Sequence, residues 1–142
     1  MFKAVIIFFL SFLPFDAAAE NRNEAEEMGH LAGMMYACNA HKTLGRYEQI
    51  VSRYFSNTTR SSDAERAKLQ LYVRAKADAY SLYRKKRKFN CAEMVNDFSS
   101  MPIFKTVVYS DGSLKMPDGK YLYPRGQKKL ADDAKKIPFE GR

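Results

Sequence analysis

Two cysteines, Cys38 and Cys91, are the residues of this 142-residue chain whose chemistry is most restricted. In an exported protein an even pair of cysteines favours a disulfide, which here would close a loop of about 50 residues. The chain-entropy model assigns such a bridge roughly 4 kcal/mol. The alternatives are a bridge between two molecules, two free thiols, or a zinc site in which His41 joins both sulfurs. No fourth zinc ligand is evident, so we expect the Cys38–Cys91 disulfide and neither metal nor cofactor.

Residues arranged for catalysis are sparse. The chain has no G-x-S-x-G nucleophile motif, no H-E-x-x-H metal motif and no glycine-rich phosphate loop. Glu93 and Asp97 are spaced to share one helix face, but a solvated face explains that spacing better than acid–base catalysis. His30 and His41, the only histidines, are expected at the surface or at helix ends. We therefore expect no catalytic residues and no enzymatic activity.

Basic residues give the chain a formal net charge of +8. Between Arg66 and Lys88 nine lysines and arginines accompany a single acid, Asp78, and tyrosines are interleaved with them. Cations beside aromatic rings can hold phosphates, anionic sugars or lipid headgroups, and can bind nucleic acid nonspecifically. The alternative is simple solubility around a tyrosine-rich core. The candidate binding surface comprises Arg74, Lys76, Tyr80, Arg84, Lys85, Lys86, Arg87 and Lys88, together with two Asp-Gly hairpins.

The first 19 residues have the pattern of a cleavable export signal. A single cation, Lys3, precedes an apolar run over 4–15, and Ala17 and Ala19 occupy the positions that signal peptidase recognises. Cleavage before Glu20 would leave about 123 residues, the size of one domain. The apolar run is about a dozen residues long, whereas a membrane span needs roughly 20, so no integral span is expected. The expected compartment is the periplasm or the extracellular space.

Periodic apolar residues predict four helices and one weaker helix. Gly29 and Gly33 form a G-x-x-x-G pattern that indicates close packing of a neighbouring helix. Ser62, with Glu65 three residues later, fits a capping box, and the cations after Tyr83 suit the last turn of that helix. The expected helices cover 21–40, 46–55, 63–86, 91–98 and, weakly, 125–137, with 41–45 and 56–62 as connections.

The hydrophobic period changes after Pro102. Strands are expected over 104–110, 113–116 and 120–123, joined by Asp-Gly turns at Asp111 and Asp118 that belong to a repeat, Asp-Gly-x4-Pro. The expected fold is mainly α, a four- to five-helix bundle with a small C-terminal antiparallel β-hairpin or meander, in the α+β class. A single domain would cover 20–124, followed by a weak helix or tail over 125–142.

The export signal, the small size, the Lys-, Asn- and Tyr-rich mature chain and the basic run 84–88 resemble small Sec-exported proteins of host-associated bacteria, some of which are effectors. This resemblance implies a non-enzymatic binding protein, with an unidentified protein or anionic ligand as its partner. Lys85–Lys88 also matches a short nuclear-import signal. Helices closed by one long-range disulfide are similar to periplasmic acid-stress chaperones, which implies a chaperone as the alternative function. Enzyme inhibition is the third.

Overall fold

The computed structural model describes residues 17–86 and 89–139, so most of the expected export signal lies outside the described residues. The helices are α1 (Ala17–Ala37), α2 (His41–Thr58), α3 (Ser62–Tyr83) and α4 (Cys91–Ser99), followed by the 3-10 helix η1 (Pro102–Lys105). Three short strands, β1 (Val107–Val108), β2 (Leu114–Lys115) and β3 (Tyr121–Leu122), form an antiparallel sheet in the order β1-β2-β3. The mainly helical α+β fold with a C-terminal meander is therefore confirmed.

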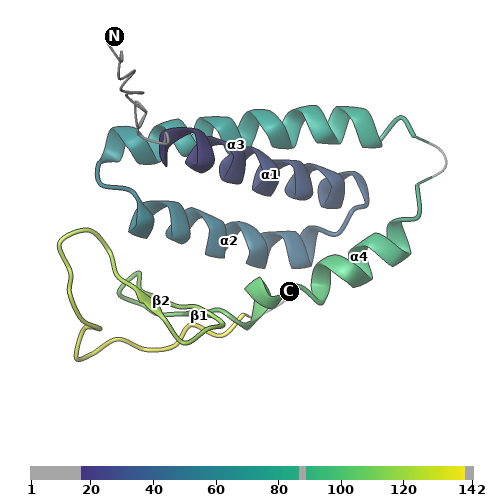
Figure 1. Cartoon of the computed structure of the whole chain (residues 1–142). Helices are drawn as coiled ribbons and strands as arrows, with labels where there is room; N and C mark the ends of the chain where they lie inside the picture. Colours follow the sequence, from purple (N-terminus) through teal and green to yellow (C-terminus); the bar gives the residue numbers. More distant parts are fainter. Residues whose placement is uncertain (1–16, 87–88, 140–142) are drawn as a thin grey trace, which may run out of the picture.

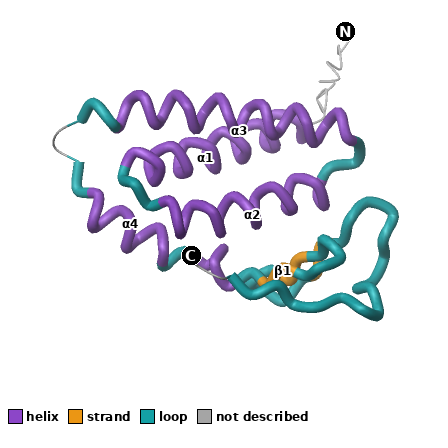
Figure 2. Tube along the Cα trace, turned by 180° about the vertical axis from the view of Figure 1, so that it is seen from behind, coloured by secondary structure: helices purple, strands orange, loops and turns teal. Residues whose placement is uncertain are grey.

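The molecule is layered, with α1 and α3 side by side, α2 beneath them and the sheet beyond α2 (Figure 1, and from behind in Figure 2). Helices α1 and α3 run parallel and make the largest interface, since Gly29 faces Tyr72 and Gly33 faces Lys76 one turn further along. A Cβ atom added at either glycine would overlap the backbone carbonyl oxygen of its α3 neighbour. The predicted role of the G-x-x-x-G pattern in helix packing is confirmed.

A tight turn joins α1 to α2, so the expected connection over 41–45 is wrong. Asn39 adopts a left-handed backbone with φ of 57°, and the Ala40 amide donates to the Met35 carbonyl oxygen over 3.0 Å. Asparagine tolerates this conformation better than most residues, and the pattern is typical of a helix C-terminus. Helix α2 consequently begins at His41, and it extends to Thr58 rather than ending at Phe55.

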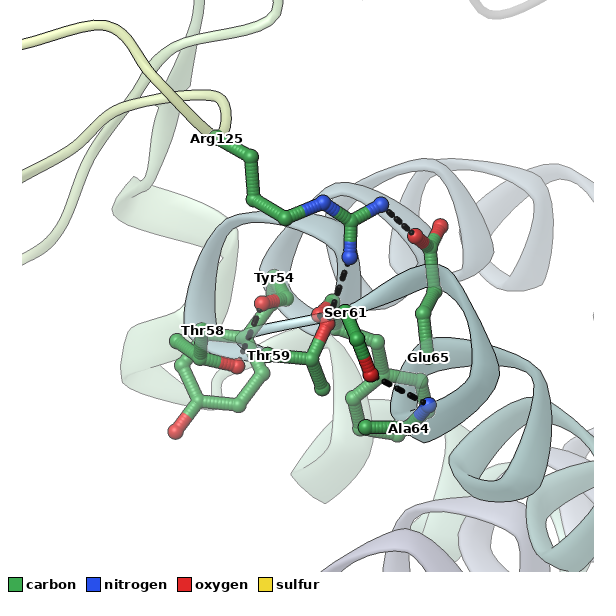
Figure 3. A network of polar contacts seen from close by, with 8 residues as sticks. Tyr54, Thr58, Thr59, Ser61, Ala64, Glu65 and Arg125 are labelled. Atoms are coloured by element: carbon green, nitrogen blue, oxygen red, sulfur yellow. Dashed lines mark hydrogen bonds and ion pairs between the residues drawn. The ribbon is translucent and has the colours of Figure 1, made fainter.

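The N-terminus of α3 also differs from the expectation. The cap is Ser61, whose hydroxyl accepts from the Ala64 amide at 3.2 Å, and not Ser62. Glu65 does not complete a capping box, because its carboxylate binds Arg125 at 2.6 Å (Figure 3). The same guanidinium donates to the Thr59 hydroxyl at 3.3 Å. Arg125 thereby fastens the C-terminal segment to the α2–α3 junction.

The disulfide forms within the chain, as predicted. Cys38 follows the last residue of α1, Cys91 is the first residue of α4, and their Cα atoms lie 5.4 Å apart. The Asn90 side chain caps α4 by accepting from the Glu93 amide at 3.2 Å, which confirms the expected start of this helix. The bridge holds the start of α4 beside the end of α1. Further along α4, Phe98 enters the core against Tyr47 of α2 and Phe104 of η1.

Two apolar clusters form the interior. The larger lies among the helices and includes the buried Tyr47 and Phe55 of α2, Met35 of α1 and Phe98 of α4. The smaller lies between α2 and the sheet and consists of Ile50, Val108 and Leu114, with Leu122 and Ile137 packed against it. Helix α2 therefore contributes to both clusters, and its amphipathic sequence lets it separate α1 and α3 from the sheet.

The two Asp-Gly segments form three-residue loops of the same geometry, and not the expected two-residue turns. In the first, the Tyr109 amide donates to the Ser113 carbonyl oxygen at 2.9 Å, and Gly112 has φ of 94°. In the second, the Met116 amide donates to the Lys120 carbonyl oxygen at 2.8 Å, and Gly119 has φ of 87°. A glycine in this region is the usual third residue of such loops. The sequence repeat is thus a structural repeat.

The segment 125–137 contains no helix. It lacks an apolar stripe, and its one well-placed aliphatic residue, Ile137, packs into the smaller core cluster. The Ile137 amide donates to the Val108 carbonyl oxygen at 2.8 Å, and Lys136 forms a β-bridge with Tyr109. The segment therefore lies beside β1 and pairs with it through a single β-bridge. The expected strand from 104 is shorter because Pro102 opens η1, which includes Phe104.

Asp111 organises the first loop, and its replacement provides a test of the fold. Its carboxylate accepts hydrogen bonds from the Ser113 amide and hydroxyl, the Gln127 side chain and the Ala131 amide. Burial opposes ionisation, but these hydrogen bonds prevail and lower the pKa of Asp111 to about 2. The ionised form therefore stabilises the fold above the unfolded-state pKa near 4, and this contribution disappears as the pH falls through about 2.

We expect Asp111→Asn to lower the free energy of unfolding by about 1–3 kcal/mol at neutral pH, because several donors lose a charged acceptor. The loss should shrink between about pH 4 and pH 2, since the wild-type carboxyl becomes protonated there. Asp118→Asn is the matched control, because Asp118 holds the same position in the second loop but caps only the Lys120 amide. Urea unfolding at several pH values measures both variants. Equal losses in the two variants would contradict the special role of Asp111.

Candidate functional site

Three residues of the predicted binding surface come together along one side of α3. Lys76, Tyr80 and Arg84 are spaced four residues apart and so lie one above the other on the helix. The Arg84 guanidinium lies over the Tyr80 ring, 5.5 Å from its centroid, and the Lys76 ammonium lies 5.2 Å from the centroid of the Tyr36 ring. These contacts place cations on aromatic faces, where the ring quadrupole attracts them.

Helix α1 and the start of α2 complete this arrangement with Tyr36 and His41. Tyr36 packs edge-on against Tyr80, with centroids 5.0 Å apart, and His41 packs edge-on against Tyr36 at 5.1 Å. Tyr36 is 40% exposed, an unusual position for a large aromatic side chain. We call the continuous set His41, Tyr36, Tyr80 and Arg84 the aromatic row.

Of the four residues of the aromatic row, Tyr80 and Arg84 were predicted from the sequence as part of the binding surface, and Tyr36 and His41 were not. Tyr36 follows Gly33 by three residues and Gly29 by seven, so it lies on the side of α1 that packs on α3, and the G-x-x-x-G pattern that marks this side was the available signal. His41 was expected in a connection and not in a helix. Its partnership with Tyr36 depends on the tight turn at Asn39.

Lys76 is less available for a ligand than the sequence suggested. Its ammonium forms an ion pair with Glu48 of α2, and Glu48 also accepts from the Tyr72 hydroxyl at 3.1 Å. Burial first, and then the neighbouring Glu48 carboxylate, raise the pKa of Tyr72. Lys76 therefore belongs to an internal polar group that joins α2 to α3, and it borders the aromatic row without offering a free charge.

The cations that follow α3 are placed differently. Helix α3 ends at Tyr83, so Arg84 is its C-cap, and Lys85 and Lys86 lie in the turn beyond it instead of in the last helical turn. All three are exposed, and within the described part of the chain none forms an ion pair. The Lys86 ammonium lies 5.0 Å from the centroid of the Tyr83 ring. The predicted residues Arg87 and Lys88 lie outside the described residues.

Arg74 is separated from this group. It lines a shallow groove between α1 and α3 whose rim carries Glu26, Glu27 and Asp78. The acidic rim gives this side of α3 a mixed charge. Lys68, another cation of the basic stretch, is buried, pairs with Glu24 at 3.4 Å and lies over the Phe55 ring. Of the predicted binding surface, the part at the C-terminal end of α3 is therefore the part whose described cations are both exposed and outside any ion pair.

The other chemically interesting residues have simple environments. The bridge between Cys38 and Cys91 uses both sulfurs that the zinc alternative required. Glu93 lies exposed at the start of α4, where its carboxylate accepts from Asn90. His30 faces Tyr83 across the α1–α3 interface, 3.4 Å from its hydroxyl. Among the described residues, no cluster of three or more His, Cys, Asp or Glu is arranged to hold a metal ion.

The methionine face that the chaperone alternative required is only partly exposed. Met35 is 1% exposed, and Met28 and Met34 pack against the helical core. Methionines adapt to varied clients only when they are accessible. The described structure therefore offers this alternative two partly exposed methionines, Met28 and Met34, and not the full face.

No protein-family model matches the chain, and the searches of curated proteins and of solved structures found no significant match. Among residues 17–86 and 89–139, no helix has the length and apolar character that a membrane crossing requires.

Proposed function

We propose that this chain is an exported, non-enzymatic binding protein that recognises an anionic partner through the C-terminal end of α3. The observation that carries this proposal is the aromatic row next to cations that pair with no carboxylate among residues 17–86 and 89–139. Arg84 lies on Tyr80, and the exposed Lys85 and Lys86 follow it directly. Rigid tyrosine rings supply contact area at a small cost in conformational entropy, and unpaired cations supply long-range attraction.

The compartment is the second part of the proposal. An intramolecular disulfide is typical of oxidising compartments, and the pattern of Met1–Ala19 is typical of a cleaved export signal. The partner would then be met in the periplasm or outside the cell, and a host-directed effector role is consistent with the small size and the basic run. An anionic protein surface is the partner that such a site fits best, because flat aromatic rows and rim cations are typical of protein interfaces.

Neutralising the end of α3 tests the proposed surface. In Arg84→Gln, Lys85→Gln, Lys86→Gln, we expect capture of the partner from envelope or host extract to weaken about tenfold or more, because electrostatic attraction is lost. Wild-type capture should also fall as salt is raised, since exposed charges are screened. Quantitative pull-down with the oxidised protein, across a salt titration, measures both effects.

A matched variant separates local recognition from net charge. Arg60→Gln, Lys105→Gln, Lys128→Gln removes the same number of charges from exposed positions elsewhere. We expect this control to retain capture within about twofold. If the two triple variants weaken capture equally, or if neither does, the assignment of the binding surface to the end of α3 is wrong.

A further inference from the structure

The solvent side of the small sheet carries a second group of tyrosines and lysines. Val108, Leu114 and Leu122 point into the smaller core cluster. Because side chains alternate along a strand, the residues next to them in sequence point toward the other face of the sheet. Lys115 pairs with Tyr121 across β2 and β3, and Lys136 pairs with Tyr109 across the added edge. We call Tyr109, Lys115, Tyr121, Tyr123 and Lys136 the outer face of the sheet.

The tyrosines of the outer face form a platform. The rings of Tyr121 and Tyr123 are nearly parallel, with an interplanar angle of 8° and centroids 5.9 Å apart. Tyr109 lies beside Tyr121 at 6.2 Å and is almost fully buried, so it supports the platform from below. Tyr121 and Tyr123 remain partly exposed. The platform is held by the strand pairing and by the Tyr109–Lys136 bridge, and not by contact with the aromatic row on α1 and α3.

Positive charge lies directly on this platform. The Lys115 ammonium lies 5.5 Å from the centroid of the Tyr121 ring. Lys136 is exposed and pairs with Tyr109 through the isolated β-bridge. The hydrogen bond with Tyr109 and the charges of Lys115 and Lys136 lower the pKa of Tyr121. Among the described residues neither lysine forms an ion pair. The nearby Asp111 is occupied by four hydrogen bonds within its loop.

We propose that the outer face of the sheet binds an acidic polysaccharide. A pyranose ring presents a flat face of C–H groups that packs on a tyrosine ring, and the ring hydroxyls can bond the phenol edges. In a uronic acid or a sulfated sugar the anionic group is bonded to the ring that stacks, which matches a lysine lying on the stacking tyrosine. In a nucleotide the phosphate is separated from the stacking base by a sugar, so the geometry favours the acidic sugar.

This site extends the proposed binding function to a second surface, and it can be tested separately. The probe is hexagalacturonate, a chain of six uronic acids, titrated into the full oxidised protein and followed by calorimetry. Hexameric dextran serves as the uncharged control and oligothymidylate as the nucleic-acid control. We expect measurable binding of hexagalacturonate that falls with salt, and no binding of the dextran hexamer.

The decisive variants change the ring and the charges independently. Lys115→Gln with Lys136→Gln should weaken hexagalacturonate binding about tenfold, whereas Lys42→Gln with Arg60→Gln, of equal charge, should change it less than about twofold. Tyr121→Leu should weaken it about fivefold with no change in charge. Circular dichroism and thermal melting establish that each variant is folded, and the lysine pair tests the site even if Tyr121→Leu does not fold.

Four results would overturn the assignment: no binding of hexagalacturonate, equal losses from the two lysine pairs, no loss in a folded Tyr121→Leu, or tighter Tyr121-dependent binding of oligothymidylate. The last result would make single-stranded nucleic acid the occupant. The Arg84, Lys85, Lys86 triple variant should bind hexagalacturonate like the wild type. Failure at the sheet would thus leave the proposed function at the end of α3 untouched, and the reverse also holds.

Discussion

Removing the disulfide with Cys38→Ala and Cys91→Ala is expected to lower the free energy of unfolding by about 4 kcal/mol, nearly the whole stability of a small domain. The two cysteines are 53 residues apart in sequence, and their bridge restricts the unfolded chain across α2, α3 and the connection to α4. Guanidinium unfolding monitored by circular dichroism measures the loss.

Reduction of the wild-type protein is the matched control for this variant. A reductant leaves the residues in place and removes only the covalent link, so the reduced wild type should unfold close to the double variant. Both should lose the docking of α4 first, because Phe98 reaches the core from a helix that the bridge ties to α1. Identical unfolding of the oxidised and reduced wild type would show that the bridge contributes little stability.

The second large effect is expected at the α1–α3 interface. Gly29→Ala with Gly33→Ala should lower the free energy of unfolding by about 3 kcal/mol or more, although alanine is the better helix former. The added Cβ atoms would overlap the carbonyl oxygens of Tyr72 and Lys76, and backbone atoms cannot move aside without separating the helices. The variant should also disturb the contact between Tyr36 and Tyr80, since these rings meet across the same interface.

Gly45→Ala is the matched control for the glycine pair. Gly45 lies inside α2, and an added Cβ there meets no atom within 4 Å. This substitution should therefore stabilise the protein by about 1 kcal/mol, the ordinary difference in helix propensity. Thermal melting gives the sign of each change. A stabilising effect at Gly29 and Gly33 would mean that α1 and α3 do not pack through these residues.

Local signals in the sequence predicted the order of the elements well. The α4 cap at Asn90 and the Asp-Gly loops each use hydrogen bonds between residues two or three apart, so short stretches of sequence contain these partners. The bonds from Gln127 and Ala131 to Asp111 are long-range additions to the first loop. The apolar period of α2 and the G-x-x-x-G pattern of α1 predicted which faces are buried. The cysteine count predicted the bridge, because only one pairing within a single chain exists.

Element boundaries and the weak C-terminal helix were decided by tertiary partners. Glu65 could have completed a capping box, but Arg125, which is distant in sequence, takes its carboxylate. The segment before Pro138 could not bury an apolar stripe as a helix, whereas an extended chain places Ile137 in the core and pairs Lys136 with Tyr109. Competition of this kind cannot be read from neighbours in sequence, because the winning partner lies many residues away.

In the candidate sites too, some properties follow from the sequence and others from the tertiary structure. The sequence by itself determined the residue types: the density of cations, the interleaved tyrosines, the single pair of sulfurs and the repeat of Asp-Gly loops. Only the tertiary structure decided which cations remain unpaired, since Lys68 and Lys76 find carboxylates on α1 and α2 while Lys85 and Lys86 extend past the end of α3. The physical reason is that charge is a property of each residue, whereas its neutralisation depends on which residues folding brings within a few ångströms.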